Sequence, residues 1–261
     1  AIGHNALVAQ TGDNVKNTAI GGLAGDSITD GDQNTLVGYM AGSGLSGPTT
    51  TSVAGSSTYN TAVGNDALLA GTGSHNTAIG ANTCEGAMTG WYNTCVGSAA
   101  GNALTTGTGV VGGNTLIGRS AGAGMTTGTY NVAIGYAAMD ASVAGANRNI
   151  AIGKDALGGC TAATLSNIAI GTGTLSHASY AAANINLAIG TDAGDAITSG
   201  TSNVLIGHEA GSTISTLSES TAVGFNALKL ATGGINTAVG AYAAAKVSGG
   251  AGNVAVGAGA L

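Results

Sequence analysis

The sequence contains few charged residues, few aromatic rings and very little proline or cysteine. Of its 261 residues, 6 are basic, 12 are acidic, 7 are Tyr, 1 is Trp, 1 is Phe, 1 is Pro and 3 are Cys. A net charge of −6 without a basic cluster cannot displace counterions from a phosphate backbone, so we expect no nucleic-acid partner. The cysteines form no Cys-x-x-Cys pair, so we predict neither a zinc site nor a disulfide-stapled fold, and the redox compartment stays open.

Long apolar runs and Gly-X-Y triplets are missing as well. Without a run of about 18 apolar residues we expect no insertion into a membrane, and without the triplets collagen is excluded. Glycine accounts for 48 residues, and each interior glycine costs a helix about 1 kcal/mol, so an all-α fold is excluded. The chain begins Ala-Ile-Gly, without an initiator Met or a signal peptide, and we interpret it as a fragment of a longer protein.

One motif, Asn-Thr-Ala-Ile-Gly-x-x-Ala-Leu, recurs from end to end. The glycine of this motif serves as the anchor of each repeat. Twelve of the fourteen spacings between anchor glycines lie between 16 and 19 residues. The anchors are Gly3, Gly21, Gly38, Gly64, Gly80, Gly97, Gly118, Gly135, Gly153, Gly171, Gly190, Gly207, Gly224, Gly240 and Gly257.

The columns around the anchor glycine indicate how each repeat is built. Asn stands four residues before the glycine in thirteen of fourteen copies, which favours a stacked ladder in tight turns. The residue just before the glycine is Ile or Val in all fifteen copies, and we predict that this column forms the dry core. The predicted core residues include Ile20, Val63, Ile79, Ile134, Ile152, Ile189 and Val239.

Two further columns predict how the coils pack. Four residues after the glycine, Leu and Gly alternate, which indicates that volume is traded from coil to coil. Two residues before the glycine, Ala occurs in eleven of fifteen copies and points away from the Ile/Val column. This alanine stripe either covers a neighbouring segment of its own coil or forms a surface through which copies of the chain associate, and we predict a trimer.

Short strands joined by glycine bends at a period of about 17 residues are typical of a β-solenoid. We predict an all-β protein, a β-solenoid (β-roll) of about fourteen coils of 16–19 residues that spans residues 1–261 as a single domain. The 26-residue spacing after Gly38 contains a Ser/Thr/Gly-rich insertion with Pro48, and residues 42–59 are predicted to project as a loop.

The stretch Asn60-Thr61-Ala62-Val63-Gly64-Asn65-Asp66-Ala67-Leu68 resembles the repeats of phage tail fibres, and it is similar to the head repeats of trimeric autotransporter adhesins. The resemblance implies a trimeric, left-handed β-roll outside the cell, on a virion tail fibre or a cell surface, with loops that attach to a host. The expected function is that of a structural attachment protein, the shaft or head of such a fibre or adhesin, which binds surface glycans or spaces a receptor-binding tip. The alternative is a bacterial extracellular filament subunit whose solenoid ends stack head to tail.

Enzymatic readings have less support in the sequence. Ile-Gly-x-x-Ala-Leu resembles one hexapeptide of the left-handed β-helix acyltransferases, but those enzymes repeat it three times per coil and this chain has it once. The histidines fall in exposed or loop positions, so we predict no enzyme, no catalytic residue and no cofactor. The histidines are His4, His75, His177 and His208.

Metal binding is also disfavoured. Asp26, Asp30 and Asp32 form the best acidic cluster, for which a solvated loop is favoured over a cation site, and we predict no metal. Cys84 and Cys95 occupy core columns and are predicted to be buried thiols, whereas Cys160 stands in a loop.

Aromatic residues are concentrated in two columns. Tyr39, Tyr136 and Phe225 follow the anchor glycine, and a second column immediately precedes the Asn. Rings stacked on successive coils suit the apolar faces of sugars, although they can also serve only to cover strand ends. The predicted glycan site consists of Tyr59, His75, Trp91, Tyr92 and Tyr130.

Ice binding is a third function class, and it requires a regular array of exposed threonines. Thr stands three residues before the glycine in six consecutive copies, from Thr18 to Thr115. Val, Ile and Leu then replace it. This change indicates an inward or half-buried column, which disfavours ice binding.

Overall fold

The structure is a computed structural model that describes residues 1–11, 15–45, 57–105, 111–141, 144–159, 165–177 and 185–261. Its described residues contain no helix, and each of its strands is three residues long. The strands are β1 (Thr18–Ile20), β2 (Thr35–Val37), β3 (Thr61–Val63), β4 (Thr77–Ile79), β5 (Thr94–Val96), β6 (Thr115–Ile117), β7 (Val132–Ile134), β8 (Ile150–Ile152), β9 (Ile168–Ile170), β10 (Leu187–Ile189), β11 (Val204–Ile206), β12 (Thr221–Val223), β13 (Thr237–Val239) and β14 (Val254–Val256).

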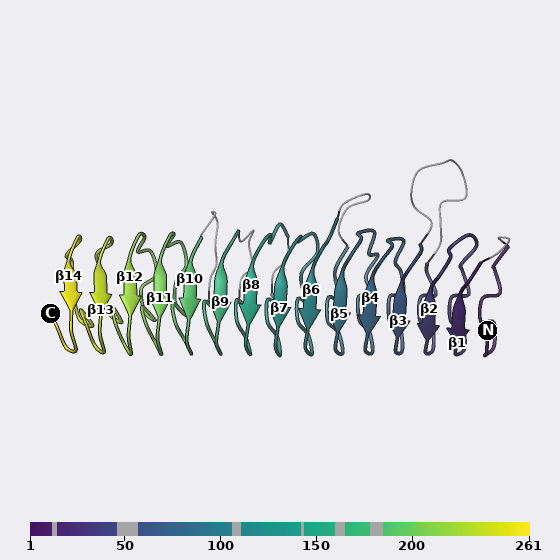
Figure 1. Ribbon diagram of the computed structural model, residues 1–261, viewed down its shortest axis with the longest axis horizontal. Coiled ribbons are helices and arrows are strands. Elements are labelled where there is room, and N and C mark those ends of the chain that lie inside the picture. Colours follow the sequence, from purple (N-terminus) through teal and green to yellow (C-terminus); the bar gives the residue numbers. More distant parts are fainter. Residues whose placement is uncertain (12–14, 46–56, 106–110, 142–143, 160–164, 178–184) are drawn as a thin grey trace. The chain divides into compact units, whose positions relative to one another are not determined.

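The chain divides into two compact units. Unit 1 comprises Ala1–Tyr130 and contains β1–β6, and unit 2 comprises Asn131–Leu261 and contains β7–β14. Within each unit, consecutive strands pair in parallel in the order in which they occur, as Figure 1 shows. Parallel neighbours need a long connection between them, and here the remainder of each coil supplies it. The predicted all-β solenoid fold is therefore confirmed, with one strand per repeat.

Register is strict, because equivalent residues of successive repeats lie side by side. Thr18 pairs with Thr35, Thr35 with Thr61, and Thr61 with Thr77. At the end of each strand the anchor glycine continues the ladder, and the N–H of Gly38 donates to the carbonyl of Ile20 at 2.8 Å. The sequence column is thus also a column in space.

The anchor position requires glycine for two reasons. Gly21 has a φ of 138°, a conformation that side chains rarely permit. A Cβ atom added to it would lie 2.2 Å from the carbonyl oxygen of Gly38 in the next coil. The other anchors that have a successor within their unit stack on it in the same way, so no other residue fits there.

The burial of the strands is the reverse of what we predicted. The middle residue of every strand is buried and the two outer residues face outward. Ile20, Ile79 and Val239 are 41%, 40% and 38% exposed. The other four predicted core residues are only half-buried: Val63, Ile134, Ile152 and Ile189.

The assignment of the Ile/Val column to the core is thus wrong. The buried column is the alanine stripe, which includes Ala19, Ala78 and Ala133, so this stripe is not a surface for association. The coil interior is narrow, and it also holds the buried alanine that stands three residues after most anchors, such as Ala24. A β-branched side chain in every strand would not fit this interior, so these side chains occupy the outer face.

Large side chains of one coil fill the space beside glycines of neighbouring coils, as predicted from the alternation of Leu and Gly. Leu36 takes the place of a strand alanine, and a Cβ atom on either Gly25 or Gly42 would lie 2.6 Å from one of its methyl carbons. Leu205 in unit 2 lies in the same way beside Gly194, at 2.7 Å. Where the fourth position is glycine, a large buried residue three positions later fills the coil: Ile28, Leu45, Leu104, Met125, Ile197 and Ile214.

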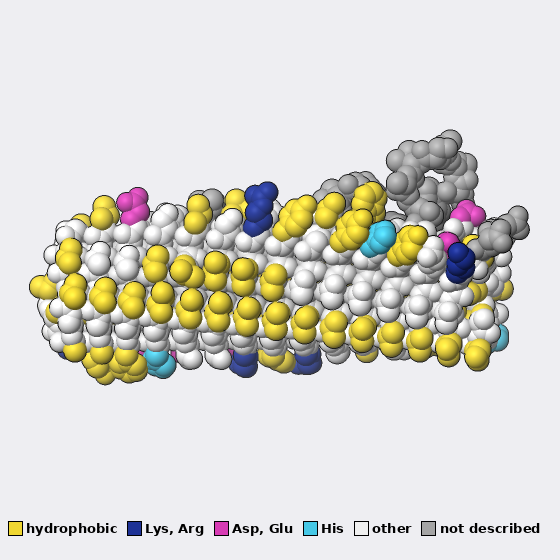
Figure 2. All heavy atoms as spheres, viewed as in Figure 1, with side chains coloured by type: hydrophobic (Ala, Val, Ile, Leu, Met, Phe, Trp, Pro, Cys, Tyr) yellow, Lys and Arg dark blue, Asp and Glu magenta, His cyan; other side chains and the backbone are white. Residues whose placement is uncertain are grey.

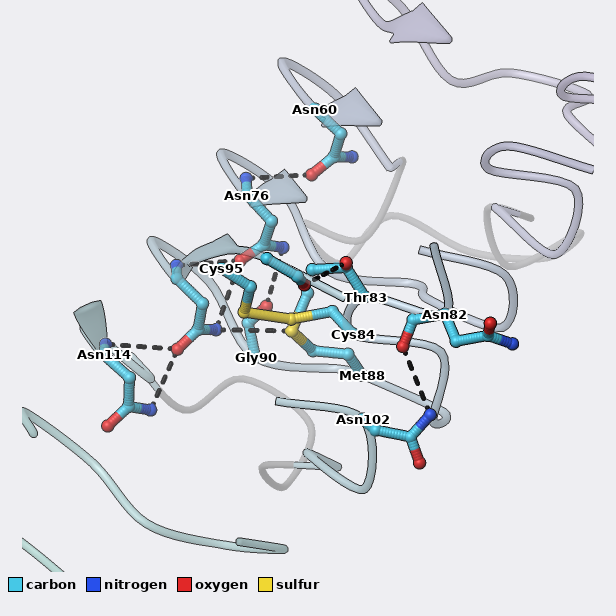
Figure 3. Close-up of a disulfide and its surroundings, with 12 residues drawn as sticks. Asn60, Asn76, Asn82, Thr83, Cys84, Met88, Gly90, Cys95, Asn102 and Asn114 are labelled. Atoms are coloured by element: carbon cyan, nitrogen blue, oxygen red, sulfur yellow. Dashed lines mark hydrogen bonds between the residues drawn. A yellow bond between two sulfur atoms is a disulfide. The ribbon is translucent and has the colours of Figure 1, made fainter. Parts of the chain in front are cut away.

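The asparagines form the ladder that the sequence favoured. The N–H of Asn60 donates to Oδ1 of Asn34 at 2.9 Å. The N–H of Asn76 donates to Oδ1 of Asn60 at the same distance, as Figure 3 shows. The Nδ2 of Asn60 donates to the carbonyl of Gly73. These buried amides are therefore paired on both sides, which is the condition for burying them without loss of stability.

Cys84 and Cys95 form a disulfide, with Cα atoms 6.6 Å apart (Figure 3). The prediction of two buried thiols is therefore wrong about their state, although both residues are fully buried. Cys84 stands four residues after one anchor and Cys95 two residues before the next. Gly25 and Leu36 occupy the equivalent positions in another repeat. The disulfide therefore fills the space that the Leu36 side chain fills there. Cys160 lies outside the described residues.

Candidate binding surfaces

The column before the asparagines forms a stack of aromatic rings in unit 1. Tyr59 and His75 have ring centroids 4.7 Å apart and planes inclined by 9°, and His75 and Tyr92 are 4.9 Å apart at 17°. All three residues have φ near 60°, which turns each side chain outward at a corner of its coil. We call Tyr59, His75 and Tyr92 the ring stack. The sequence prediction correctly brought these three residues together.

The geometry of the ring stack limits how it can bind. Both faces of His75 are covered by its neighbours, so a sugar cannot lie flat on it. The exposed parts are the ring edges and the phenol groups, since Tyr59 and Tyr92 are 50% and 53% exposed. Gln33 lies next in the column, and its Nε2 donates to Oη of Tyr59 at 3.0 Å. The stack therefore presents a strip of ring edges and hydroxyls.

The other two predicted site residues lie beside this stack. Tyr130 is exposed, and its ring lies over Gly113, where a Cβ atom would be 2.9 Å from Tyr130 Cδ1. Trp91 is half-buried and pairs its backbone with Val111 in an isolated bridge. Neither ring is among the stacking contacts of the described residues.

Much of the predicted projecting loop, 42–59, lies outside the described residues. This applies to residues 46–56, with Pro48 among them. On either side of this segment the chain belongs to the coil, because Leu45 and Ser57 are fully buried.

A second aromatic group in unit 2 combines His208, Phe225 and Tyr242. His208 and Phe225 are stacked with centroids 5.2 Å apart, and Tyr242 meets Phe225 edge-on at 5.2 Å. The sequence analysis missed this group, because Tyr242 is offset by one position from the column of Phe225. Nearby, Lys229 forms an ion pair with Glu209, and this contact lowers the pKa of the Glu209 carboxyl.

The polar clusters are surface contacts. His177 Nδ1 lies 2.7 Å from Asp195 Oδ1, and Ser176 Oγ contacts both residues. Because serine and aspartate meet the same ring nitrogen, the imidazole cannot relay a proton between them as it does in a hydrolase triad. The side chain of His177 is also 74% exposed.

The acidic residues near the start of unit 1 are separately engaged. Asp32 accepts hydrogen bonds from the N–H groups of Lys16 and Gln33, and the bond from Lys16 is the main cause that lowers its pKa. Asp26 accepts a hydrogen bond from Ser43 Oγ at 2.6 Å. Among the described residues, no group of three His, Cys, Asp or Glu side chains is placed to hold a metal ion.

The outward face of the strands is the most extensive regular surface, and its chemistry differs between the units. In unit 1 it carries a threonine column and an Ile/Val column, and we call these two columns of β1–β6 the threonine face. In unit 2, β7–β11 carry Val, Ile or Leu in both columns, and we call these ten side chains the aliphatic face. Figure 2 shows two rows of hydrophobic side chains over β7–β11 and one over β1–β6.

Comparisons of the chain with protein-family models, with curated proteins and with solved structures give no match. The described part of the chain contains no apolar helix of membrane-spanning length. The function is therefore argued from the surfaces themselves.

Proposed function

We propose that this chain is a structural attachment protein that acts outside the cell and assembles with copies of itself, as in a tail fibre or a surface adhesin. The observation that carries the proposal is the aliphatic face. It consists of ten half-buried side chains on the outward side of the strands: Val132, Ile134, Ile150, Ile152, Ile168, Ile170, Leu187, Ile189, Val204 and Ile206.

Such a face favours association. Ten contiguous aliphatic side chains with no charge among them form a patch of the kind that marks an interaction surface. Removing this surface from water contributes about 25 cal/mol for each Å² of apolar area. A second copy supplies the same repeat spacing, so its columns match these columns along their whole length.

The two columns favour a trimer. When three copies surround a common axis, each copy contacts two neighbours, and each of its two columns can face a different neighbour. Closed symmetry of this kind also avoids open-ended growth.

The disulfide supports a location outside the cytoplasm. Disulfides persist in oxidising compartments and are rare where cellular reductants keep thiols reduced. Thiol titration of the unfolded, unreduced chain should find one of the three cysteines free, because Cys84 and Cys95 are bonded. Three free thiols in protein secreted to an oxidising compartment would contradict this assignment.

Light scattering tests the assembly. The wild-type chain should give about three times 24.5 kDa, and the double variant Ile152→Lys, Ile170→Lys should give a folded monomer, because lysine charges cannot be buried at the axis. Ser202→Lys, at an exposed position outside the strands, is the matched control and should leave the trimer intact. A wild-type chain that is a folded monomer at every concentration would overturn the proposal.

Attachment to surface glycans is proposed for the ring stack. Its ring edges and phenol groups offer apolar contact next to hydrogen-bonding groups, and three copies acting together would raise a weak affinity. Binding to a surface-glycan array should be lost in Tyr59→Ala, Tyr92→Ala and kept in Tyr242→Ala, which alters the other aromatic group. Unchanged binding in the folded double variant would assign attachment to another surface.

A further inference from the structure

The threonine face differs from every other surface of unit 1 in its regularity. Thr18, Thr35, Thr61, Thr77, Thr94 and Thr115 form one column, paired in parallel and in register from strand to strand. The N–H groups of the first five donate to the asparagine carbonyl of the next coil, and each of these bonds is 2.8 Å long. The threonines are thus repeated at one uniform spacing, that of hydrogen-bonded strands, about 4.8 Å.

The face lies on the outward side of the strands, so the inward alternative of the predicted inward or half-buried column is wrong, whereas the half-buried alternative holds for four of the six threonines. Thr18 and Thr35 are exposed, and the other four threonines are half-buried within the column, as is expected of side chains packed against one another. The Ile/Val column runs beside them on the same side of the strands. The objection to ice binding that rested on an inward column is therefore removed.

The six threonine hydroxyls have no hydrogen-bond partner among the described residues. Elsewhere in the same coils, threonine hydroxyls do bond within the protein, as Thr83 Oγ1 does to the carbonyl of Gly97 at 2.8 Å. The hydroxyls of the threonine face must therefore bond to water, at positions that repeat with the strands. Between them, the methyl groups and the Ile/Val column leave water no partner except other water.

This chemistry fits an ordered water lattice better than it fits a protein. A dry protein interface would bury the hydroxyls without partners, which is unfavourable. The strands of the face contain no charged residue that would hold water in disordered shells. Hydroxyls that repeat near one of the lattice repeats of ice, beside a column of rigid β-branched side chains, can instead join the lattice directly.

We propose that the threonine face binds the surface of ice crystals. The proposal involves only the outward side chains of β1–β6 and needs them uncovered, whereas the trimer proposed above uses those of β7–β11. It assigns unit 1 a ligand, water ordered as ice, that unit 2 cannot bind through β7–β11, where the hydroxyl column is missing.

Thermal hysteresis and inhibition of ice recrystallisation test the proposal on the purified full chain. The wild type should depress the freezing point below the melting point and keep ice crystals small. The double variant Thr77→Lys, Thr94→Lys should lose both effects, since two charges in the middle of the column break the lattice match. Its melting temperature should stay close to that of the wild type because both positions face outward.

A matched control tests whether the effect requires the six-threonine array or follows from replacing any threonine of this column by lysine. Thr237→Lys changes a threonine of the same column in β13 of unit 2, outside the six-residue array, and should leave both effects intact. A wild type that behaves like serum albumin at equal concentration would overturn the proposal. Full activity in the Thr77→Lys, Thr94→Lys variant would overturn it as well.

Discussion

The outward faces of the two units have the same strand pairing but differ in one column of side chains. Thr18 to Thr115 in unit 1 correspond to Val132 to Val204 in unit 2, and both columns lie beside the same Ile/Val column. The parallel pairing is equally regular in both units, with Thr77 in register with Thr94 and Ile150 with Ile168. The strand pairing therefore does not depend on whether this column holds Thr or an aliphatic residue. The residue type in the column can thus vary with what the surface binds.

Aspartate substitutions on the two sides of a strand test whether only the inward side is essential for stability, and they should give the largest effect. Ala78→Asp and Ala133→Asp put an unpaired carboxylate inside the coil and should each lower the free energy of unfolding by about 3 kcal/mol or more. Thr77→Asp and Val132→Asp, on the outward side, should be nearly neutral in the monomer. Urea denaturation provides the measurement. Equal losses inside and outside would show that the burial of the strands is assigned wrongly.

Truncation of a buried leucine in each unit tests whether the coil interiors of the two units are packed in the same way. Leu36→Ala in unit 1 and Leu205→Ala in unit 2 each empty a space that neighbouring glycines have made, and each should cost about 2–5 kcal/mol. Val37→Ala, a half-buried residue of the outward face, is the control and should cost much less. The same denaturation curves decide the outcome. A loss in only one of the two leucine variants would show that the shared packing is not equivalent.

The disulfide should make unit 1 more stable than unit 1 without it and leave unit 2 unaffected. Among the described residues, this disulfide is found in unit 1 alone. It closes a sequence separation of 11 residues, for which the expected contribution is about 2–3 kcal/mol. Cys84→Ala, Cys95→Ala should lower the hydrogen-exchange protection of β4–β6 and leave that of β9–β13 unchanged. A uniform loss across both units would indicate that they unfold as one cooperative body.

The smallest effect concerns an ion pair found in unit 2. Lys229 lowers the folded-state pKa of Glu209 below its ordinary value of 4.5. A depressed carboxyl pKa contributes stability that is present above the unfolded pKa and is lost as the pH falls through the folded value. Glu209→Gln should therefore lower the melting temperature slightly at pH 7 and have no effect well below pH 4. The effect should be small because the pair is partly exposed, and an equal effect at both pH values would contradict this origin.

Several features were predictable because they repeat in the sequence. The anchor glycines, the strand positions and the asparagine ladder each follow from a column whose residue type has few alternative explanations. Ser220, the one exception in the asparagine column, still links its neighbours: its N–H donates to Asn203 Oδ1, and its hydroxyl accepts from the N–H of Asn236 at 3.3 Å. The ring stack was also predictable, since equal positions on successive coils must lie one above another.

The amino-acid sequence by itself determined the repeat, the all-β solenoid and the partition of each strand into two faces. Alternation along a strand places Thr and Ile on one side and Ala on the other, but it is symmetrical and does not say which side is inside. Only the tertiary structure decided this, because the narrow coil admits alanine, with a leucine only where neighbouring glycines leave room. The same packing brought Cys84 to Cys95 and turned the threonines to solvent, since contacts between different columns depend on how the coil closes and not on the repeat itself.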